Sequence, residues 1–333
     1  MPHPAPLWIT GVCPFAGSWS GCTRGARLSG RMKDALIPSD GRPFSLAAGI
    51  AAGLGRGELA GPRFARPFHG VRELRVPGEQ RHGTREQLRR GCEQYAVRLR
   101  GGQFFYGETA LVLLGAPAPE RWKSVVHVAA YRPADAPRTR GVVGHRLAAR
   151  AAAPWSVFGL RVEHPARALV QAAGTWAADD IIAAADFLIA RRKPLVTLDQ
   201  LRAEASHARR PHLHGLLDQV RDGSESPRET RLRLAIVRAG LPEPELAWEL
   251  YTPEGEFVAR IDQAYLRYRV AVEYDGRQHA DDVAQFERDA DRWDAIRAQG
   301  WDHVRILRHH LAGDGAVAVE KVRTALLRAG WRP

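Results

Sequence analysis

Cysteine and long apolar runs are both scarce in this sequence, and each scarcity narrows the class of protein. Three cysteines (Cys13, Cys22 and Cys92) stand among 333 residues, without a C-x-x-C or Cys/His pattern. So sparse and odd a count argues against a disulfide framework or a zinc site and favours a reducing, cytoplasmic location. No apolar run approaches the roughly 20 residues of a membrane span. A glycine-rich nucleotide loop and a nucleophile triad are also absent from the sequence.

Lysine is scarce too, with four residues among 49 basic ones. The accompanying richness in Arg, Ala, Gly and Pro is typical of GC-rich coding, so arginine abundance alone does not indicate nucleic-acid binding. The distribution of charge is more informative. Residues 226–333 hold 17 basic and 18 acidic residues, whereas residues 1–225 hold 32 and 19. A basic part joined to a part with an acidic site is typical of a protein that handles DNA. A generally basic protein is the alternative.

The length predicts two or three domains. Residues 1–31 mix Pro, Gly, Ser, Trp and Cys without a period, which predicts a disordered extension with Met32 as the natural start. A short ordered arm is the alternative. No basic region precedes the apolar patch 7–15, so a signal peptide is not expected. Residues 218–225, DQVRDGSE, predict a linker.

Residues 270–279, VAVEYDGRQH, organise the C-terminal part. Alternation predicts a strand whose one face is apolar and whose other face carries Glu273 and Asp275. Gly276 ends the strand at a turn, and His279 follows it. Acids at a strand end, followed by a histidine, indicate a candidate divalent-metal site.

Asp262 belongs to the preceding predicted strand, 257–266. A tight turn at Arg267 and Tyr268 would place Asp262 directly opposite Glu273, with Cβ atoms about 4.5–5.5 Å apart. Two carboxylates that close repel each other unless a cation lies between them. Two interpretations remain open here: a metal site, or a solvated acidic edge of the sheet.

The elements around these strands follow a definite order. Ser226 and Glu229 form an S-x-x-E capping box at the start of a helix over 226–240. Strands over 246–251, 257–266 and 270–275 follow, then a helix over 282–299, a strand over 302–307 and a helix over 316–329. The order α-β-β-β-α-β-α predicts a mixed α/β (α+β) fold.

This order, with the pattern D…E-x-D-G-x-x-H, resembles the PD-(D/E)xK nuclease superfamily, and most closely its branch related to very-short-patch-repair (Vsr-like) endonucleases. The resemblance covers about residues 224–331. It implies a restriction-endonuclease-like core (domain 226–333) that hydrolyses phosphodiester bonds in DNA with Mg²⁺ or Mn²⁺. Asp262 matches the first metal-binding acid, Glu273 the (D/E), and Glu229 the acid on the first helix.

The sequence departs from the family pattern in two respects. Asp275 stands where the family has Lys, so it would be a further metal ligand, with Gln278 or His279 orienting water. The family's structural zinc and its mismatch-specific nicking are not carried over, because residues 226–333 contain no cysteine.

The front of the chain resembles AbiEi-type antitoxin proteins. Residues 69–72, HGVR, follow a helical stretch, as in a degenerate winged helix over 32–80, and FFYGETALVLLG at 104–115 is similar to a pattern in the middle region, here an α/β domain over 81–217. The resemblance implies DNA binding or a toxin-type protein partner. His127 and His145 are expected to be hydrogen-bonded core or edge residues. The alternative function is a non-catalytic DNA-binding regulator that keeps a nuclease fold. DNA and RNA remain undistinguished as substrates, and the oligomeric state stays open.

Overall fold

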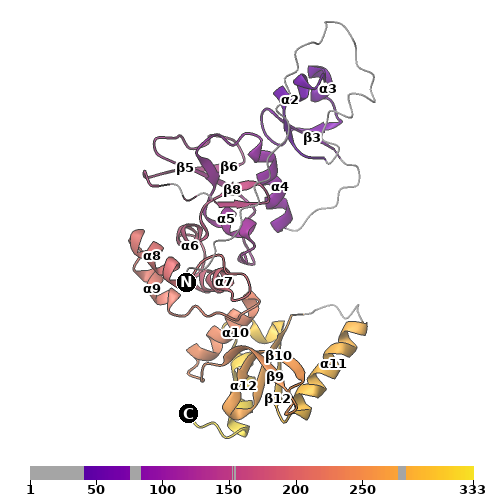
Figure 1. The fold of residues 1–333 in the computed structure, drawn as a ribbon, viewed down its shortest axis with the longest axis vertical. Coiled ribbons are helices and arrows are strands. Elements are labelled where there is room, and N and C mark those ends of the chain that lie inside the picture. The colour runs from indigo at the N-terminus through magenta and orange to yellow at the C-terminus, as the bar shows by residue number, and fades with distance from the viewer. Residues whose placement is uncertain (1–40, 76–83, 152, 154, 277–282) are drawn as a thin grey trace, which may run out of the picture.

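The computed structural model describes residues 41–75, 84–151, 153, 155–276 and 283–333, and the side chains of 283–289 lie outside the description. The described chain is a mixed α/β protein with three separate sheets, which follow one another along the sequence (Figure 1). The expected extension over 1–31, the start at Met32 and His279 lie outside the described residues. Within the described part, no helix is both long enough and apolar enough to cross a bilayer.

The first sheet has the order β1-β3-β2 and packs against two short helices. Phe44 and Phe64 meet edge to face in its core, with ring centroids 5.8 Å apart. Phe44 lies on a strand, and the helix begins only after Ser45, whose Oγ accepts a hydrogen bond from Ala48 N. Ile50 is therefore left exposed. The elements are β1 (Phe44–Ser45), α2 (Leu46–Ala51), α3 (Arg56–Ala60), β2 (Phe64–Ala65) and β3 (Val71–Leu74).

The second sheet, of order β6-β5-β4-β8-β7, forms the middle part with the helices around it. Residues 155–162 form a hairpin whose turn is Phe158 and Gly159, both at positive φ. Two such residues match the right-handed twist of the flanking strands. The elements are α4 (Thr84–Ala96), β4 (Gln103–Phe105), α5 (Gly107–Leu114), β5 (Val126–Tyr131), β6 (Val142–Leu147), β7 (Trp155–Val157), β8 (Leu160–Val162), α6 (Pro165–Ala172), α7 (Ala178–Ile189), α8 (Leu198–His207) and α9 (His212–Leu217).

The third sheet, of order β12-β11-β10-β9, carries the acids singled out in the sequence. Strands β9, β10 and β11 pair antiparallel, and β12 pairs parallel to β11 because the helix α11 crosses between them. The order of elements is the predicted α-β-β-β-α-β-α. The elements are α10 (Pro227–Arg238), β9 (Glu245–Tyr251), β10 (Phe257–Tyr265), β11 (Val270–Asp275), α11 (Val283–Ala298), β12 (Asp302–Leu307) and α12 (Ala316–Arg328).

The third sheet is covered on both faces. Helices α10 and α12 bury one face, where Leu232 and Val322 pack with Val272. Helix α11 lies over the other, where Ile296 packs with Ala264 and Ala271. Side chains alternate between the two faces of a strand, so the face of Ala271 also holds Glu273 and Asp275. The acids therefore lie beneath α11.

The middle and C-terminal parts are joined by packing as well as by the chain. Leu234 of α10 belongs to the core of the middle part, and Val220 of the expected linker is buried in the same core. At the contact of α10 with α7, Arg233 Nη2 donates to Asp186 Oδ2 at 2.9 Å, and both side chains are almost completely buried. Segment 218–225 is therefore packed, unlike a free linker.

Candidate nuclease site

Asp262 and Glu273 lie side by side at the centre of the third sheet. The observed register pairs Gln263 with Val272 and Tyr265 with Val270, which is the register expected from the sequence. The connecting turn is longer than expected: a 3-10 turn over Leu266–Tyr268 is followed by Arg269 at φ 49°. Because the added residues extend the loop symmetrically, the register does not change. Asp262 Oδ2 accepts a hydrogen bond from Tyr274 N at 3.0 Å, across to the neighbouring strand.

The environment of Asp262 disfavours its negative charge. Burial raises its pKa first, and the charges of Glu229 and Glu273 raise it further, to about 7. The hydrogen bond from Tyr274 N and the charge of Arg292 act in the opposite direction but do not balance these effects. The negatively charged form of Asp262 is therefore disfavoured, and a cation beside it would stabilise that form.

Both carboxylate oxygens of Glu273 are engaged. Oε1 accepts from Arg292 Nη2 on α11, and Oε2 lies 3.0 Å from His303 Nε2 on β12. Glu273 is 4% exposed, so these two partners provide hydrogen bonds to a carboxylate that has little access to water.

Asp275 is engaged separately. Its Oδ2 accepts from Nε of Arg305 at 2.9 Å and also from Nη2 of the same guanidinium group. The guanidinium carbon lies 4.4 Å from the centroid of the Trp293 ring, and that ring stacks on His303. Among the described residues, no group of three or more His, Cys, Asp or Glu side chains is arranged to hold a metal ion. The structure therefore brings Asp262 together with Glu273 but does not add Asp275 as a third ligand.

Glu229 lies in the first turn of α10, at the edge of this site. Its backbone N donates to Ser226 Oγ at 3.2 Å, as the capping box predicts, whereas its carboxylate accepts from Glu225 N at 2.7 Å. Burial raises the pKa of Glu229. Its backbone oxygen accepts from Gln263 Nε2, which ties the helix start to β10. Glu229 thus completes a cap and also repels Asp262.

A divalent cation fits the Asp262 and Glu273 pair on the charge of the donors. One oxygen of Asp262 is held by the backbone, and the negative charge of Asp262 stays disfavoured although Arg292 lies close by. Carboxylate oxygens are the ligands that Mg²⁺ prefers. Binding through Glu273 would require one of its two partners to move.

Arg292, His303 and Arg305 were not singled out in the sequence, although part of the signal is there. Strand β12 runs parallel to β11 in the register Ala271 to His303 and Glu273 to Arg305. A parallel fourth strand therefore brings its alternate polar residues onto the acid face. Arg292 could not be found in this way, because its contact depends on how α11 lies over the sheet.

Arg72, in the HGVR segment of the front part, has a buried side chain. Its guanidinium group is buried and donates to Leu59 O and Val71 O. Arg72 therefore holds the helix α3 against β3, and its contacts are to the protein itself.

The middle part holds a second polar cluster. His127 Nε2 lies 2.9 Å from Glu108 Oε1, and His127 Nδ1 lies 3.0 Å from His145 Nε2. Glu108 Oε2 also accepts from the indole nitrogens of Trp122 and Trp176. The two histidines are hydrogen-bonded, as expected. These bonds keep the pKa of Glu108 low in spite of burial.

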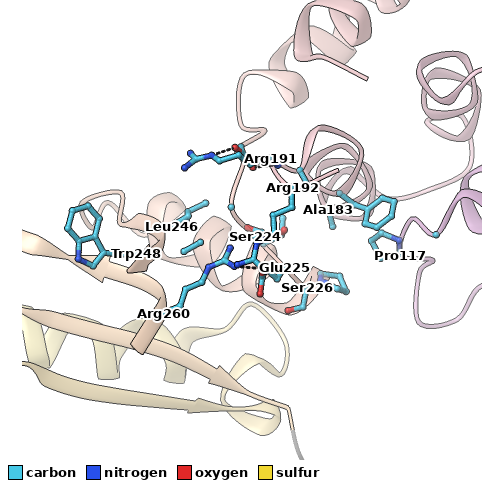
Figure 2. A pocket seen from close by; sticks show the side chains of 18 of the residues that line it. Pro117, Ala183, Arg191, Arg192, Ser224, Glu225, Ser226, Leu246, Trp248 and Arg260 are labelled. Atoms are coloured by element: carbon cyan, nitrogen blue, oxygen red, sulfur yellow. Dashed lines mark hydrogen bonds and ion pairs between the residues drawn. The ribbon is translucent and has the colours of Figure 1, made fainter. Parts of the chain in front are cut away.

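A cavity of about 890 Å³ separates α7 from the β9 edge of the third sheet (Figure 2). Arg260 reaches it from β10 and pairs with Glu225 at 2.7 Å, while Arg191 pairs with Asp222 at 2.8 Å. The lining of the cavity contains equal numbers of arginines and acids. The arginines are Arg85, Arg191, Arg192 and Arg260, and the acids are Asp222, Glu225, Glu245 and Glu249. The cavity therefore lacks the positive charge expected of a surface that follows phosphates.

No family model matches the chain. Two curated relatives of Mycobacterium tuberculosis, the uncharacterized protein MT2308 of strain CDC 1551 and the uncharacterized protein Rv2248 of strain H37Rv, are each 34% identical over 84 residues. The match covers 25% of this chain and 31% of each relative, so the chain spans about a third of their length. No solved structure matches. The chemistry of the site must therefore carry the functional argument.

Proposed function

We propose that residues 226–333 form a PD-(D/E)xK, Vsr-like endonuclease domain that hydrolyses phosphodiester bonds in DNA. The observation that carries this proposal is the placement of Asp262 beside Glu273, where burial and the charges of Glu229 and Glu273 disfavour the negative charge of Asp262. The order α10-β9-β10-β11-α11-β12-α12 and the sheet order β12-β11-β10-β9 also support it.

Asp262 and Glu273 would hold Mg²⁺ or Mn²⁺. When bound, the cation would polarise the scissile phosphate and make its bound water more acidic. Glu229 adds negative charge from the helix start, and His303 fixes the orientation of the Glu273 carboxylate. Asp275, bound to Arg305, orders the strand end that leads towards His279.

Plasmid cleavage tests the proposal. Wild-type protein is expected to convert supercoiled plasmid in the presence of Mg²⁺ or Mn²⁺ and to be inactive in EDTA. Asp262→Asn and Glu273→Gln should each lower the rate at least about 10²-fold, and together no further, because they remove one site. Asp294→Asn is the control, since Asp294 forms an exposed pair with Arg297 on α11. Full activity of both site variants would contradict the proposal.

The second candidate function is a non-catalytic DNA-binding regulator of the AbiEi type, with DNA or a toxin-type protein as partner. Two contacts favour it: both oxygens of Glu273 are engaged by protein groups, and Asp275, in the family's Lys position, is neutralised by Arg305. Metal-independent DNA binding without cleavage would identify this function.

Both functions predict that DNA is bound by the front of the chain. Arg66 and Arg140 are exposed and line a cavity of about 800 Å³. The Arg66→Gln/Arg140→Gln double variant should bind DNA more weakly, and the slope of log K against log salt should become shallower by about 1.8, or about 0.9 for each phosphate that is no longer neutralised. Arg267→Gln/Arg332→Gln, at exposed C-terminal positions, is the matched control. If both double variants weaken DNA binding equally, DNA binding depends on the total charge and not on arginines at the front of the chain.

A further inference from the structure

Arg292 occupies a position between the candidate metal ligand and the backbone of the neighbouring strand. Its Nη2 donates both to Glu273 Oε1 and to the backbone oxygen of Arg260, the latter at 2.7 Å. Arg260 lies two residues before Asp262 on β10, so one guanidinium group bridges the two strands that carry the acids. A cation is therefore already present at the acid pair, and it is supplied by the protein.

The two partners of Glu273 differ in their freedom to move. The His303 side chain is 1% exposed and is fixed on β12 beneath Trp293. The Arg292 side chain is 35% exposed and reaches inward from α11 on a long, flexible stem. Of the two, Arg292 is the partner that can leave Glu273 without unpacking the sheet. Its departure would free Oε1 and would leave the buried pair with His303 intact.

A displaced Arg292 would remain beside the site, because its helix is fixed by Ile296 in the core with Ala264 and Ala271. A guanidinium group is always charged and binds phosphate with two parallel hydrogen bonds. Asp275, at the position from which the family's Lys acts, cannot contribute a positive charge, and it is bound to Arg305. Arg292, on α11, is a positive group that already contacts one of the two acids.

We propose that Arg292 is an exchangeable cation of this site: it neutralises Glu273 until a divalent cation takes its place, and then contacts the phosphate of the substrate. This inference rests on the proposed nuclease function. It predicts two opposite effects of one substitution. Removing the guanidinium group removes a competitor for Glu273, so Mn²⁺ should bind more tightly. It also removes a phosphate contact, so turnover should fall.

Mn²⁺ binding to the full-length protein, measured by electron paramagnetic resonance, tests the first effect. Arg292→Gln should bind Mn²⁺ about tenfold more tightly than wild type, within the usual range of coupling between two ligands. Arg292→Lys, which keeps the charge, should bind like wild type. The matched control is Arg297→Gln, on the same helix in an exposed pair with Asp294, which should not change the affinity. Circular dichroism of each variant establishes that the fold is retained.

Plasmid cleavage at saturating Mn²⁺ tests the second effect. Arg292→Gln should lower kcat about 10²-fold, the usual consequence of removing one group that contacts developing charge, and Arg292→Lys should recover part of it. If wild type binds Mn²⁺ through Asp262 but Arg292→Gln binds it equally or more weakly, the exchange is overturned and the nuclease proposal stands. If neither protein binds Mn²⁺, the nuclease proposal itself fails. Unchanged kcat in Arg292→Gln would overturn the phosphate contact.

Discussion

Asp262→Asn is expected to make the protein more stable at pH 8, although it replaces one carboxylate oxygen by an amide nitrogen in a partly buried site. The carboxyl group has a pKa of about 7 in the folded protein, against about 3.9 in an unfolded chain. At a pH between these two pKa values, the carboxyl group is protonated in the folded state and ionised in the unfolded state. The stability of the folded state falls as pH rises through this window, and the penalty is complete above pH 7.

The size of the effect follows from the difference in pKa. A difference of about three pH units corresponds to roughly 4 kcal/mol, and relaxation around the site should reduce the observed gain to about 2–4 kcal/mol. Asparagine carries no charge at any pH, and its side-chain oxygen can still accept from Tyr274 N. The gain should therefore vanish below pH 4.

Urea unfolding at pH 4 and pH 8, with and without Mg²⁺, measures this difference. Asp302→Asn is the control, because Asp302 forms an exposed pair with Arg328. A variant that is less stable than wild type at pH 8 in the absence of metal would show that Asp262 already has its counter-charge from the protein. Mg²⁺ should raise the stability of wild type only, since it binds the folded state through Asp262.

The second large effect is expected at the joint between α7 and α10. Asp186→Ala should cost about 3–5 kcal/mol, because it leaves Arg233 charged and almost completely buried without its principal partner. Thr230 Oγ1 and Arg221 N, which donate to the same carboxylate at 2.8 and 2.7 Å, lose their acceptor as well. Glu243, 3.8 Å from Arg233, compensates only in part.

An exposed pair on the same two helices provides a matched control. Arg238 binds Asp179 through two hydrogen bonds, and both side chains are well exposed. Asp179→Ala should cost less than about 1 kcal/mol. The double variant Asp186→Leu/Arg233→Met should recover most of the stability, since it removes both charges together. If urea unfolding shows equal destabilisation by Asp186→Ala and Asp179→Ala, burial does not increase the contribution of the ion pair to the free energy of unfolding.

Local signals predicted the order of elements and the register of the acids. Alternation in 270–275, the cap at Ser226 and the limits of β12 each depend on residues close together in the sequence. The observed register survived a turn that was longer than predicted, because both versions centre on the same pair of residues.

The partners of the acids could not be predicted in the same way. Arg292 is 19 residues from Glu273 and meets it only because α11 lies over that face of the sheet. Glu108 binds Trp176 across 68 residues, and nothing local to either residue indicates the contact. Residues 218–225 had the composition of a linker, yet their packing depends on a helix from each neighbour.

The buried contact between Asp186 and Arg233 has a consequence for where the proposed nuclease would cleave DNA relative to its binding site. A buried ion pair and the shared residue Leu234 leave no hinge between the middle part and the third sheet. In a protein that binds DNA with one part and cleaves it with the other, such a rigid connection fixes the distance between the two sites. With the proposed function, the cut would fall at one constant offset, counted in base pairs, from the place where the middle part contacts DNA.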